Sequence, residues 1–392
     1  MTSISRAFVL GGILAAVPLW AVYAPIPERE QGKDFSVTAK AGVSYDSNLF
    51  GAASRGIGST IFSFSPHLAY NASVTDQTFM AATYGLTLDK FDNRPGEKLL
   101  SSHEANLRLA HAFSKATTLD VNDMFMLSRN PESLLAGVPL NPDQSFSRNQ
   151  LDARFDTPLA AKTSANIKAR SVYYKYRNGA LGRGLDRTEN LYGLAGDYAI
   201  LPEFKGVAEY RHQDVFYRKV GESKNKSSEF LMGGFEYAIA RKLALNTRLG
   251  VEWRSRAAER GTSAPFAEFS AKYDYAEKSF LTGGFGYNLE ETSDTQRFND
   301  TKIKRAFVNV QHSVTALIVA SASVSFEPST LQGRRGISNV DERTVRTGGA
   351  LSYLPSKNWT ISGSADYDRT RSDEGTRNLS RKRVGLSASY SF

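Results

Sequence analysis

The sequence predicts an all-β fold, a transmembrane antiparallel β-barrel of about 18 strands that follows an N-terminal signal segment. Three observations predict this fold. From residue 34 onward, apolar and polar residues alternate in stretches of about ten residues. The connections alternate between short turns and long loops, and aromatic residues recur near the ends of the stretches.

The composition excludes several other classes of protein. Of the 392 residues, 41% are apolar and none is cysteine. The lack of cysteine excludes disulfide scaffolds, thiol catalysis and cysteine-ligated metal sites. Only residues 7–24 approach the ~18 consecutive apolar residues that a membrane-spanning helix needs.

Residues 1–33 are expected to be a signal peptide with a short N-terminal extension, and residues 34–392 the barrel. Arg6 precedes the apolar run of residues 7–24, as a basic segment precedes the apolar segment of a secretory signal. Pro25 follows that run and disfavours cleavage there, so we expect a displaced cleavage site. A retained helical anchor is the alternative.

The last predicted strand shows the alternation most clearly. One face of residues 381–392 carries apolar side chains and the other carries arginine, glycine and serine. The apolar face consists of Val384, Leu386, Ala388, Tyr390 and Phe392. The expected strand centres are residues 39, 66, 84, 107, 122, 151, 170, 194, 209, 233, 249, 270, 285, 308, 322, 349, 363 and 387.

Short and long connections are expected at opposite ends of the barrel. The intervening loops are predicted to run about eight to seventeen residues. Short turns at one end and long loops at the other are typical of barrels in the outer membrane of Gram-negative bacteria, with the short turns periplasmic. The predicted short turns contain Ser114-Lys115, Leu201-Pro202, Ala240-Arg241, Glu277-Lys278 and Pro355-Ser356.

A resemblance to a known group rests on the start and end of this pattern. The first strand ends in AGVSYDSNLFG (residues 41–51), and the last ends in SASYSF. The chain resembles the outer-membrane β-barrel porin families of Gram-negative bacteria. It is most similar to the group found with exopolysaccharide synthesis and export systems, in which a Tyr-Asp-Ser-Asn stretch such as Tyr45 to Asn48 recurs. The resemblance implies an outer-membrane channel, with a polysaccharide as one candidate cargo. Phe392 resembles a general signal for the barrel-assembly machinery.

Charged residues are assigned to the interior of the barrel, because a charge that faces lipid near the midplane would cost ~2–4 kcal/mol. Carboxylates, including Asp120, Glu209 and Glu268, share this face. Opposed basic and acidic walls would create a transverse field, whereas cross-strand ion pairs would stabilise a water-filled barrel. The predicted pore-lining residues are Arg108, Arg154, Lys168, Arg170, Arg211, Arg248, Arg305, Arg346, Asp366 and Asp368, with Arg254 and Arg383 on the same face.

A barrel of this width is expected to enclose a water-filled channel, because its own side chains are too short to fill it. The longest predicted loop, roughly residues 129–147, contains the apolar stretch SLLAGVPL. Leu134, Leu135 and Val138 are therefore predicted to fold inward and narrow the channel. Packing against a neighbouring loop or a partner protein is the alternative.

The long loops are predicted to carry a basic rim. This rim could steer an anionic saccharide or bind the phosphates of outer-membrane lipid and lipopolysaccharide. Polysaccharide export proteins are a further candidate partner, whereas nucleic acid is not expected, because the basic residues are scattered. The rim residues are Arg177, Arg183, Arg187, Arg218, Lys219, Lys224, Lys226, Arg334, Arg335 and Arg343.

Catalysis, cofactors and metals are not expected. His67 and His103 neighbour serines, but adjacent strand residues point to opposite faces and cannot form a triad. Asp366 and Asp368 could pair or bind a divalent cation, but charge inside a strand is the simpler interpretation. The predicted function is therefore passage of hydrophilic solutes. A structural or adhesive barrel and an outer-membrane hydrolase are the alternatives.

Overall fold

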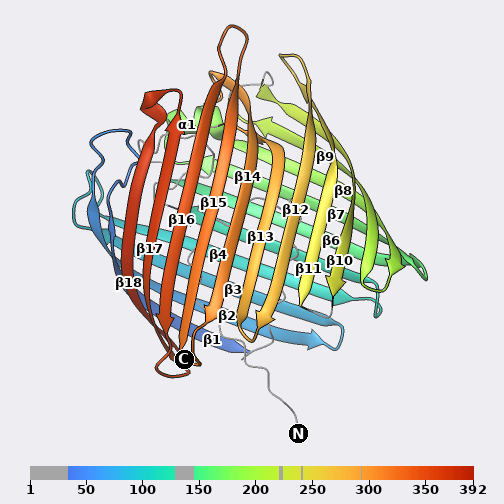
Figure 1. Cartoon of the computed structure of the whole chain (residues 1–392), viewed down its shortest axis with the longest axis horizontal. Coiled ribbons are helices and arrows are strands. Elements are labelled where there is room, and N and C mark those ends of the chain that lie inside the picture. The colour runs from blue at the N-terminus through green and yellow to red at the C-terminus, as the bar shows by residue number, and fades with distance from the viewer. Residues whose placement is uncertain (1–33, 129–144, 220–223, 240–241, 293) are drawn as a thin grey trace.

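Eighteen antiparallel strands form one closed sheet (Figure 1). Each strand pairs with its neighbours in the sequence, and β1 closes the barrel by pairing with β18. In Figure 1 the strands of the near side cross those of the far side at a steep angle, as expected when all strands tilt in one sense around a barrel. The computed structural model describes residues 34–128, 145–219, 224–239, 242–292 and 294–392.

The predicted all-β barrel and its 18 strands are confirmed, and each predicted centre lies inside a strand. The first nine strands are β1 (Phe35–Asp46), β2 (Ser59–Thr75), β3 (Thr78–Phe91), β4 (Leu99–Ala112), β5 (Thr118–Ser128), β6 (Phe146–Ala160), β7 (Thr163–Tyr176), β8 (Arg187–Leu201) and β9 (Phe204–Tyr217). The second nine are β10 (Lys226–Ile239), β11 (Leu243–Arg256), β12 (Thr262–Ala276), β13 (Ser279–Glu291), β14 (Phe298–Ser313), β15 (Ile318–Gly333), β16 (Val340–Tyr353), β17 (Trp359–Ser372) and β18 (Leu379–Ser391).

Among the helices whose bounds the structure describes, α1 (Gly179–Leu185) follows β7 and the 3-10 helix η2 (Gly375–Arg377) follows β17. The described residues contain no helix that is both long and apolar enough to cross a membrane. The predicted signal segment, the turn at residues 240–241 and the predicted constriction residues Leu134, Leu135 and Val138 lie outside the described residues.

The expected loop length is wrong for the C-terminal half of the chain. β11 ends at Arg256 and β12 begins at Thr262, and β15 ends at Gly333 and β16 begins at Val340. These connections are shorter than the predicted eight residues, because the strands continue beyond the apolar band into the polar segments that were assigned to loops. The barrel wall is therefore tall at this end.

Prolines within the strands lie where one of the two hydrogen-bond ladders is interrupted. Pro265 of β12 pairs with Val251 of β11, but β12 and β13 pair only from Ala267 and Tyr287 toward the short turn. Pro328 of β15 falls in a gap of the β14–β15 ladder. Proline lacks the N–H that a second ladder would need, so it is tolerated at such positions.

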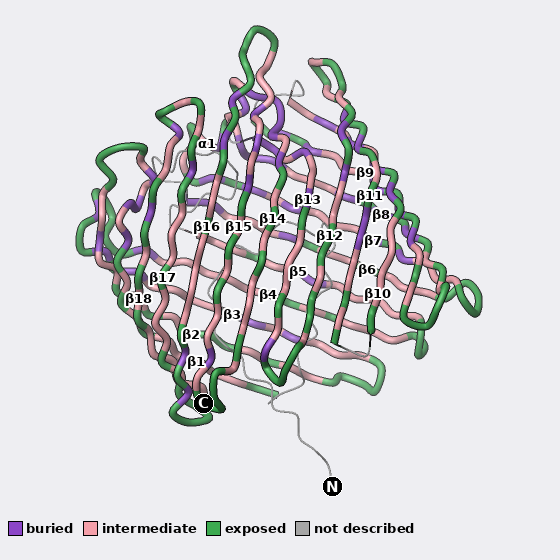
Figure 2. The backbone as a smooth tube through the Cα atoms, viewed as in Figure 1, coloured by how far each residue is buried: buried purple, intermediate pink, exposed green. Residues whose placement is uncertain are grey.

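The barrel has no central apolar core among its described residues. Large apolar side chains are exposed on the outer face, and the buried ones form small clusters mainly near the long connections. Figure 2 shows buried stretches around the upper ends of β13 to β15, while exposed and intermediate residues alternate along the strands. The long-connection end is therefore the most tightly packed part of the molecule.

Candidate functional site

Most charged residues of the strands point toward the axis of the barrel. On β4, Arg108 lies between Leu107 and Leu109, which are both exposed on the outer face. On β10, Lys226, Ser228, Phe230 and Met232 are buried, whereas Leu231 is exposed. Ion pairs between strands that are not neighbours, such as Lys168 of β7 with Glu209 of β9, also require the concave side. This geometry places these charges on the inner face of the barrel.

The cations predicted to line a pore are paired with carboxylates along the wall. Arg108 Nε donates to Asp120 Oδ2 (3.0 Å), Arg170 Nε to Asp152 Oδ1 (2.5 Å), and Arg383 Nη2 to Asp368 Oδ2 (3.1 Å). Arg305 bonds Glu290 and Glu327, and Arg346 also bonds Glu327. Asp366 is the register partner of Arg383. Basic and acidic residues therefore alternate on one wall, which favours cross-strand stabilisation over two opposed walls of charge.

Glu209 is the centre of an ion-pair cluster on the wall. Its carboxylate is fully buried and accepts hydrogen bonds from Arg211 (2.7 Å), Arg248 (3.1 Å) and Lys168 (3.4 Å). Arg211 also reaches Glu268, and Arg248 reaches Glu236. A buried charge is tolerated only when it is paired in this way. The cluster links β7 to β12 across the inner surface.

Several inward charges remain in contact with solvent, although they face the centre of the molecule. The side chain of Arg154 is 43% exposed and that of its partner Asp156 is 32% exposed. Arg346 is 47% exposed and Glu236 is 39% exposed. Such exposure would not occur in a filled core, so this part of the interior is open to water.

A second sector of the inner wall is lined by small hydroxyl side chains. These side chains bond each other across strands, as Ser352 and Ser362 do (2.8 Å), Thr344 and Thr370 (2.9 Å), and Thr38 and Ser391 (3.0 Å). The pairs lie on β16 to β18 and β1, whereas the charged clusters lie mainly on β4 to β14. The interior therefore presents a sector that is rich in hydroxyls, to which Arg346, Asp368 and Arg383 add charge, and a sector with the buried charge clusters.

The upper parts of β13 and β14 lean into the barrel. Register places Glu291 and Asp300 on the same face as Phe285, which is exposed on the outside lower down. Both carboxylates nevertheless contact Lys226 and Arg254, which lie on the inward face of β10 and β11. β13 and β14 can lean in front of β10 and β11 because β12 and β13 do not pair beyond Ala267 and Tyr287 on the side of the long connections. We call residues 288–292 and 294–301 the inner hairpin.

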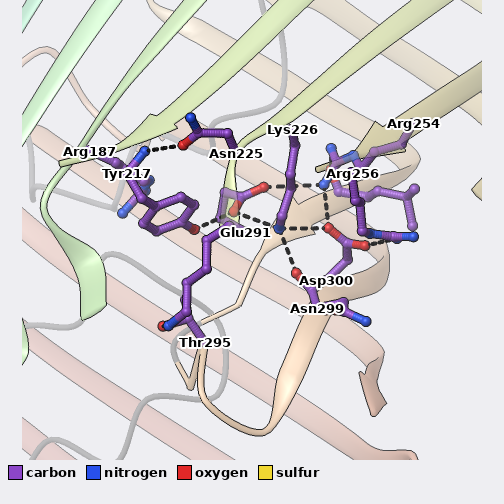
Figure 3. A network of polar contacts seen from close by, with 12 residues as sticks. Arg187, Tyr217, Asn225, Lys226, Arg254, Arg256, Glu291, Thr295, Asn299 and Asp300 are labelled. Carbon is purple, nitrogen blue, oxygen red and sulfur yellow. Dashed lines mark hydrogen bonds and ion pairs between the residues drawn. The ribbon is translucent and has the colours of Figure 1, made fainter. Parts of the chain in front are cut away.

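Buried ion pairs hold the inner hairpin against β10 and β11 (Figure 3). Lys226 Nζ donates to Glu291 Oε2 (2.8 Å), Asp300 Oδ1 (2.9 Å) and the Asn299 carbonyl (2.5 Å). Arg254 Nη1 donates to Asp300 Oδ1 (2.7 Å) and Glu291 Oε1 (3.2 Å). β10 and β14 are four strands apart, about 19 Å along the wall at ~4.8 Å per strand, so the contact must cross the interior.

The tip of the inner hairpin extends the contact to the opposite connections. Thr295 Oγ1 donates to the Gly184 carbonyl of α1 (3.0 Å) and accepts from Lys224 Nζ (2.7 Å). Arg334 Nε donates to the Thr295 carbonyl (3.1 Å) and its guanidinium pairs with Glu259. Four connections of the chain therefore meet at Thr295, which narrows the long-connection mouth of the barrel.

Sequence reasoning missed the inner hairpin and misplaced part of the basic rim. Arg187 and Lys226 were expected in solvated loops, but they are buried strand residues, and Arg343 lies within β16. The error arose because their partners come from distant strands or lie on the face that alternation assigns to the outside. The available signal was the register pair Glu291 and Asp300, because two carboxylates on the face that alternation assigns to lipid indicate that this segment does not face lipid.

The Tyr-Asp-Ser-Asn stretch that carried the family resemblance joins the first strand to the last. Asp46 accepts from Arg381 Nε (2.8 Å), and both side chains are buried. Asn48 Nδ2 donates to the Ser380 carbonyl (3.1 Å), and Ser47 exchanges hydrogen bonds with Lys382. These contacts give the motif a structural role at the β1–β18 junction.

Comparisons with known proteins agree with this architecture. The porin OccAB2 of Acinetobacter baumannii matches 91% of this chain and 97% of its own, with a TM-score of 0.50 and 11% identity. A BenF-like porin from Pseudomonas fluorescens Pf-5 matches 92% and 99%, with a TM-score of 0.50 and 11% identity. No family model matches the chain, and no match is found among curated proteins. At this level of identity the likeness shows the fold, an 18-stranded barrel similar to those of outer-membrane porins.

Within the described ranges, no group of three or more histidine, aspartate or glutamate side chains could hold a metal ion. Asp366 and Asp368 lie beside Arg383 instead.

Proposed function

We propose that this protein is an outer-membrane channel through which hydrophilic solutes diffuse. The observation that carries the proposal is the solvent exposure of inward charges such as Arg154 and Arg346 in a barrel too wide for its side chains to fill. The apolar outer surface supports a membrane location, because Leu194, Val324 and Leu386 would otherwise be exposed to water.

The hydroxyl-rich sector supports saccharides as the solute class. Serine and threonine hydroxyls exchange hydrogen bonds with sugar hydroxyls without imposing a net charge. The ion pairs of the charged sector order the water that lies opposite the hydroxyls. Export of an exopolysaccharide is a finer candidate that rests on the resemblance of residues 45–48. The structural role of Asp46 and Asn48 at the β1–β18 junction accounts for that stretch without a cargo.

Single-channel recording of the purified protein in planar bilayers tests the proposal. We expect a stable conductance that falls when a permeating oligosaccharide is added. A folded barrel that conducts no ions under any applied voltage would overturn it. Deletion of residues 133–141, which lie outside the described residues, tests whether Leu134, Leu135 and Val138 narrow the channel. An increase in conductance is the expected result.

The inner hairpin is the observation that favours a second candidate, a structural or adhesive barrel whose mouth is closed. Thr295 connects β13–β14 to α1, Lys224 and Arg334. If this closure is complete, release of the hairpin should create a conductance that the native protein lacks. The two candidates therefore differ in the recording of the native protein. No catalytic role is part of either proposal.

A further inference from the structure

Five basic residues form a belt on the outer face of the barrel, near the ends of β14 and β16 to β18 that carry the long connections. We call Lys304, Arg343, Arg369, Arg371 and Lys382 the basic belt. All five are exposed. Strand register places them on the outer face. Arg369, for example, is the register partner of Val345, which is in turn the partner of Phe326, and Phe326 is exposed among the lipid-facing residues.

The basic belt lacks carboxylate partners, in contrast to the inner wall. No ion pair joins any of its members to another described residue, and Lys304 Nζ lies 5.8 Å from the centroid of the Tyr287 ring. The carboxylates closest in register are those of Asp341 and Asp373, which lie further toward the long connections. The Asp341 carboxylate accepts a hydrogen bond from Thr330 Oγ1, and the Asp341 N–H donates to the Asp373 carboxylate. Cations that are paired inside and unpaired outside indicate an external anion.

Two members of the belt face each other directly. Arg343 of β16 and Arg371 of β17 are register partners on the same outer face. Like charges at opposed positions repel, so this arrangement destabilises the sheet unless an anion lies between them. Arginine binds phosphate through two parallel hydrogen bonds, which makes a phosphate a suitable bridging anion.

The belt lies just beyond the apolar band. On β17 the outward residues run from Trp359 through Ile361 and Ala365 to Tyr367, and then to Arg369. The interval from Trp359 to Tyr367 spans about 26 Å of strand, or about 20 Å along the barrel axis after tilt, close to the height of a lipid-facing band. Arg369 and Arg371 therefore lie at the level of lipid headgroups.

An apolar groove lies directly below the belt on the same outer face. It is a shallow, open depression of about 760 Å³, and its lining includes Val43, Tyr45, Leu351, Ala365, Val384 and Leu386. The groove exists because Gly349 and Gly363 present no side chain there. Val384, which lines the groove, lies two residues after Lys382 on the same face of β18, so the groove and the belt are continuous.

We propose that this face binds a phosphorylated glycolipid of the outer leaflet, of the lipid A type. Its phosphates lie between Arg343, Arg369, Arg371 and Lys382, and one acyl chain lies in the groove. The proposal rests on the membrane location in the proposed function, but it does not depend on conduction. The groove and the unpaired cations are separate observations that require the same amphipathic ligand.

Lipid retention tests the proposal. The full-length protein is incubated with phosphatidylcholine vesicles that contain lipid A, extracted in mild detergent and weighed by native mass spectrometry. We expect retained lipid A, and a reduction of about tenfold or more in R369Q/R371Q/K382Q, because each cation near an anionic surface strengthens binding severalfold. The matched control K115Q/K162Q/K205Q removes three exposed cations near the short turns and should retain lipid A as the native protein does.

Further arms separate the sources of the phosphate and the two parts of the site. G349L fills the groove, where an added Cβ meets only the Ser321 carbonyl at 3.6 Å, and should also reduce retention. Equal retention of dephosphorylated lipid A, displacement by inorganic phosphate alone, or unchanged retention in both variants would overturn the proposal. Conductance is recorded on the same samples. Variants that lose lipid A but conduct normally support this site. Native protein that retains lipid A but does not conduct counts against the proposed channel and not against this site.

Discussion

Arg381 of the last strand donates two hydrogen bonds from its guanidinium to the carboxylate of Asp46 on the first strand. Both side chains are buried, at 5% and 1% exposure. The residues are 335 positions apart in the chain, so the pair forms only when the barrel closes. The long-connection end of the β1–β18 junction is therefore fixed by a charge pair, whereas the rest of the junction depends on the backbone ladder.

Removal of Arg381 should destabilise the barrel strongly. R381M leaves the Asp46 carboxylate buried without its partner, a change that costs ~3–5 kcal/mol in comparable pairs. Urea unfolding in detergent micelles, followed by heat-modifiable migration on gels, measures the effect. R154M is the matched control, because the Arg154–Asp156 pair is solvent-exposed and should contribute only ~0–1 kcal/mol. Equal midpoints for the two variants would show that the junction does not depend on this pair.

Charge reversal should change ion selectivity only where the inward charge contacts water. R154E and R346E place negative charge at positions whose side chains are 43% and 47% exposed, so the reversal potential in a salt gradient should shift toward cations. R211E instead buries a third carboxylate beside Glu209 and Glu268 and should lower the yield of folded barrel. A normal yield of R211E would contradict the assigned burial.

Release of the inner hairpin should increase conductance. T295V removes the hydrogen bonds to Gly184 and from Lys224, each with a net contribution of ~0.5–1.5 kcal/mol. The hairpin should then occupy the mouth less completely, and single-channel recordings should show larger or newly opened currents. S352A is the control, because it removes the hydroxyl contact with Ser362 beside the short turn between β16 and β17, at the opposite end of the barrel. Identical currents in native protein and T295V would show that the hairpin does not limit flow.

The contact between Arg297 and Glu374 should depend on pH. A hydrogen bond from Arg297 holds the pKa of the Glu374 carboxyl below its usual value. Because the pKa is lowered on folding, the stabilisation is present above the unfolded pKa of ~4.3 and is lost as the pH falls through the lower folded value. Limited proteolysis of the connection after β17 should therefore accelerate in acid, and E374Q should remove the acid dependence. The pair is partly exposed, so the effect on global stability should be below ~1 kcal/mol.

The orientation of the barrel predicts which tags are accessible on intact cells. An epitope inserted at Gly375 lies at the long-connection end and should be labelled, whereas one between Pro355 and Asn358 lies at the opposite end and should not. Labelling of lysed cells controls for expression. The reverse pattern would mean that the short connections face outward.

The strand positions could be predicted because each strand follows a local rule. Alternation within a stretch such as residues 381–392 requires no knowledge of its neighbours, and all 18 centres fall inside strands. The same rule failed at Glu291 and Asp300, because the direction in which a wall segment leans depends on where its neighbour stops pairing. The sequence likewise shows that Arg211 and Glu209 share a face, but not that Glu209 collects three cations from three strands.

The separation of β12 from β13 also has a dynamic consequence. Above Ala267 and Tyr287, the amides of residues 262–266 have ladder partners only on β11, and those of residues 288–291 only on β14. Backbone amides that lack a second neighbouring strand open with less free energy than those in the middle of a sheet. Amide deuterium exchange should therefore be faster in these two segments than in the parts of β15 and β16 at the same level of the barrel, so that exchange rates locate the separation of β12 from β13.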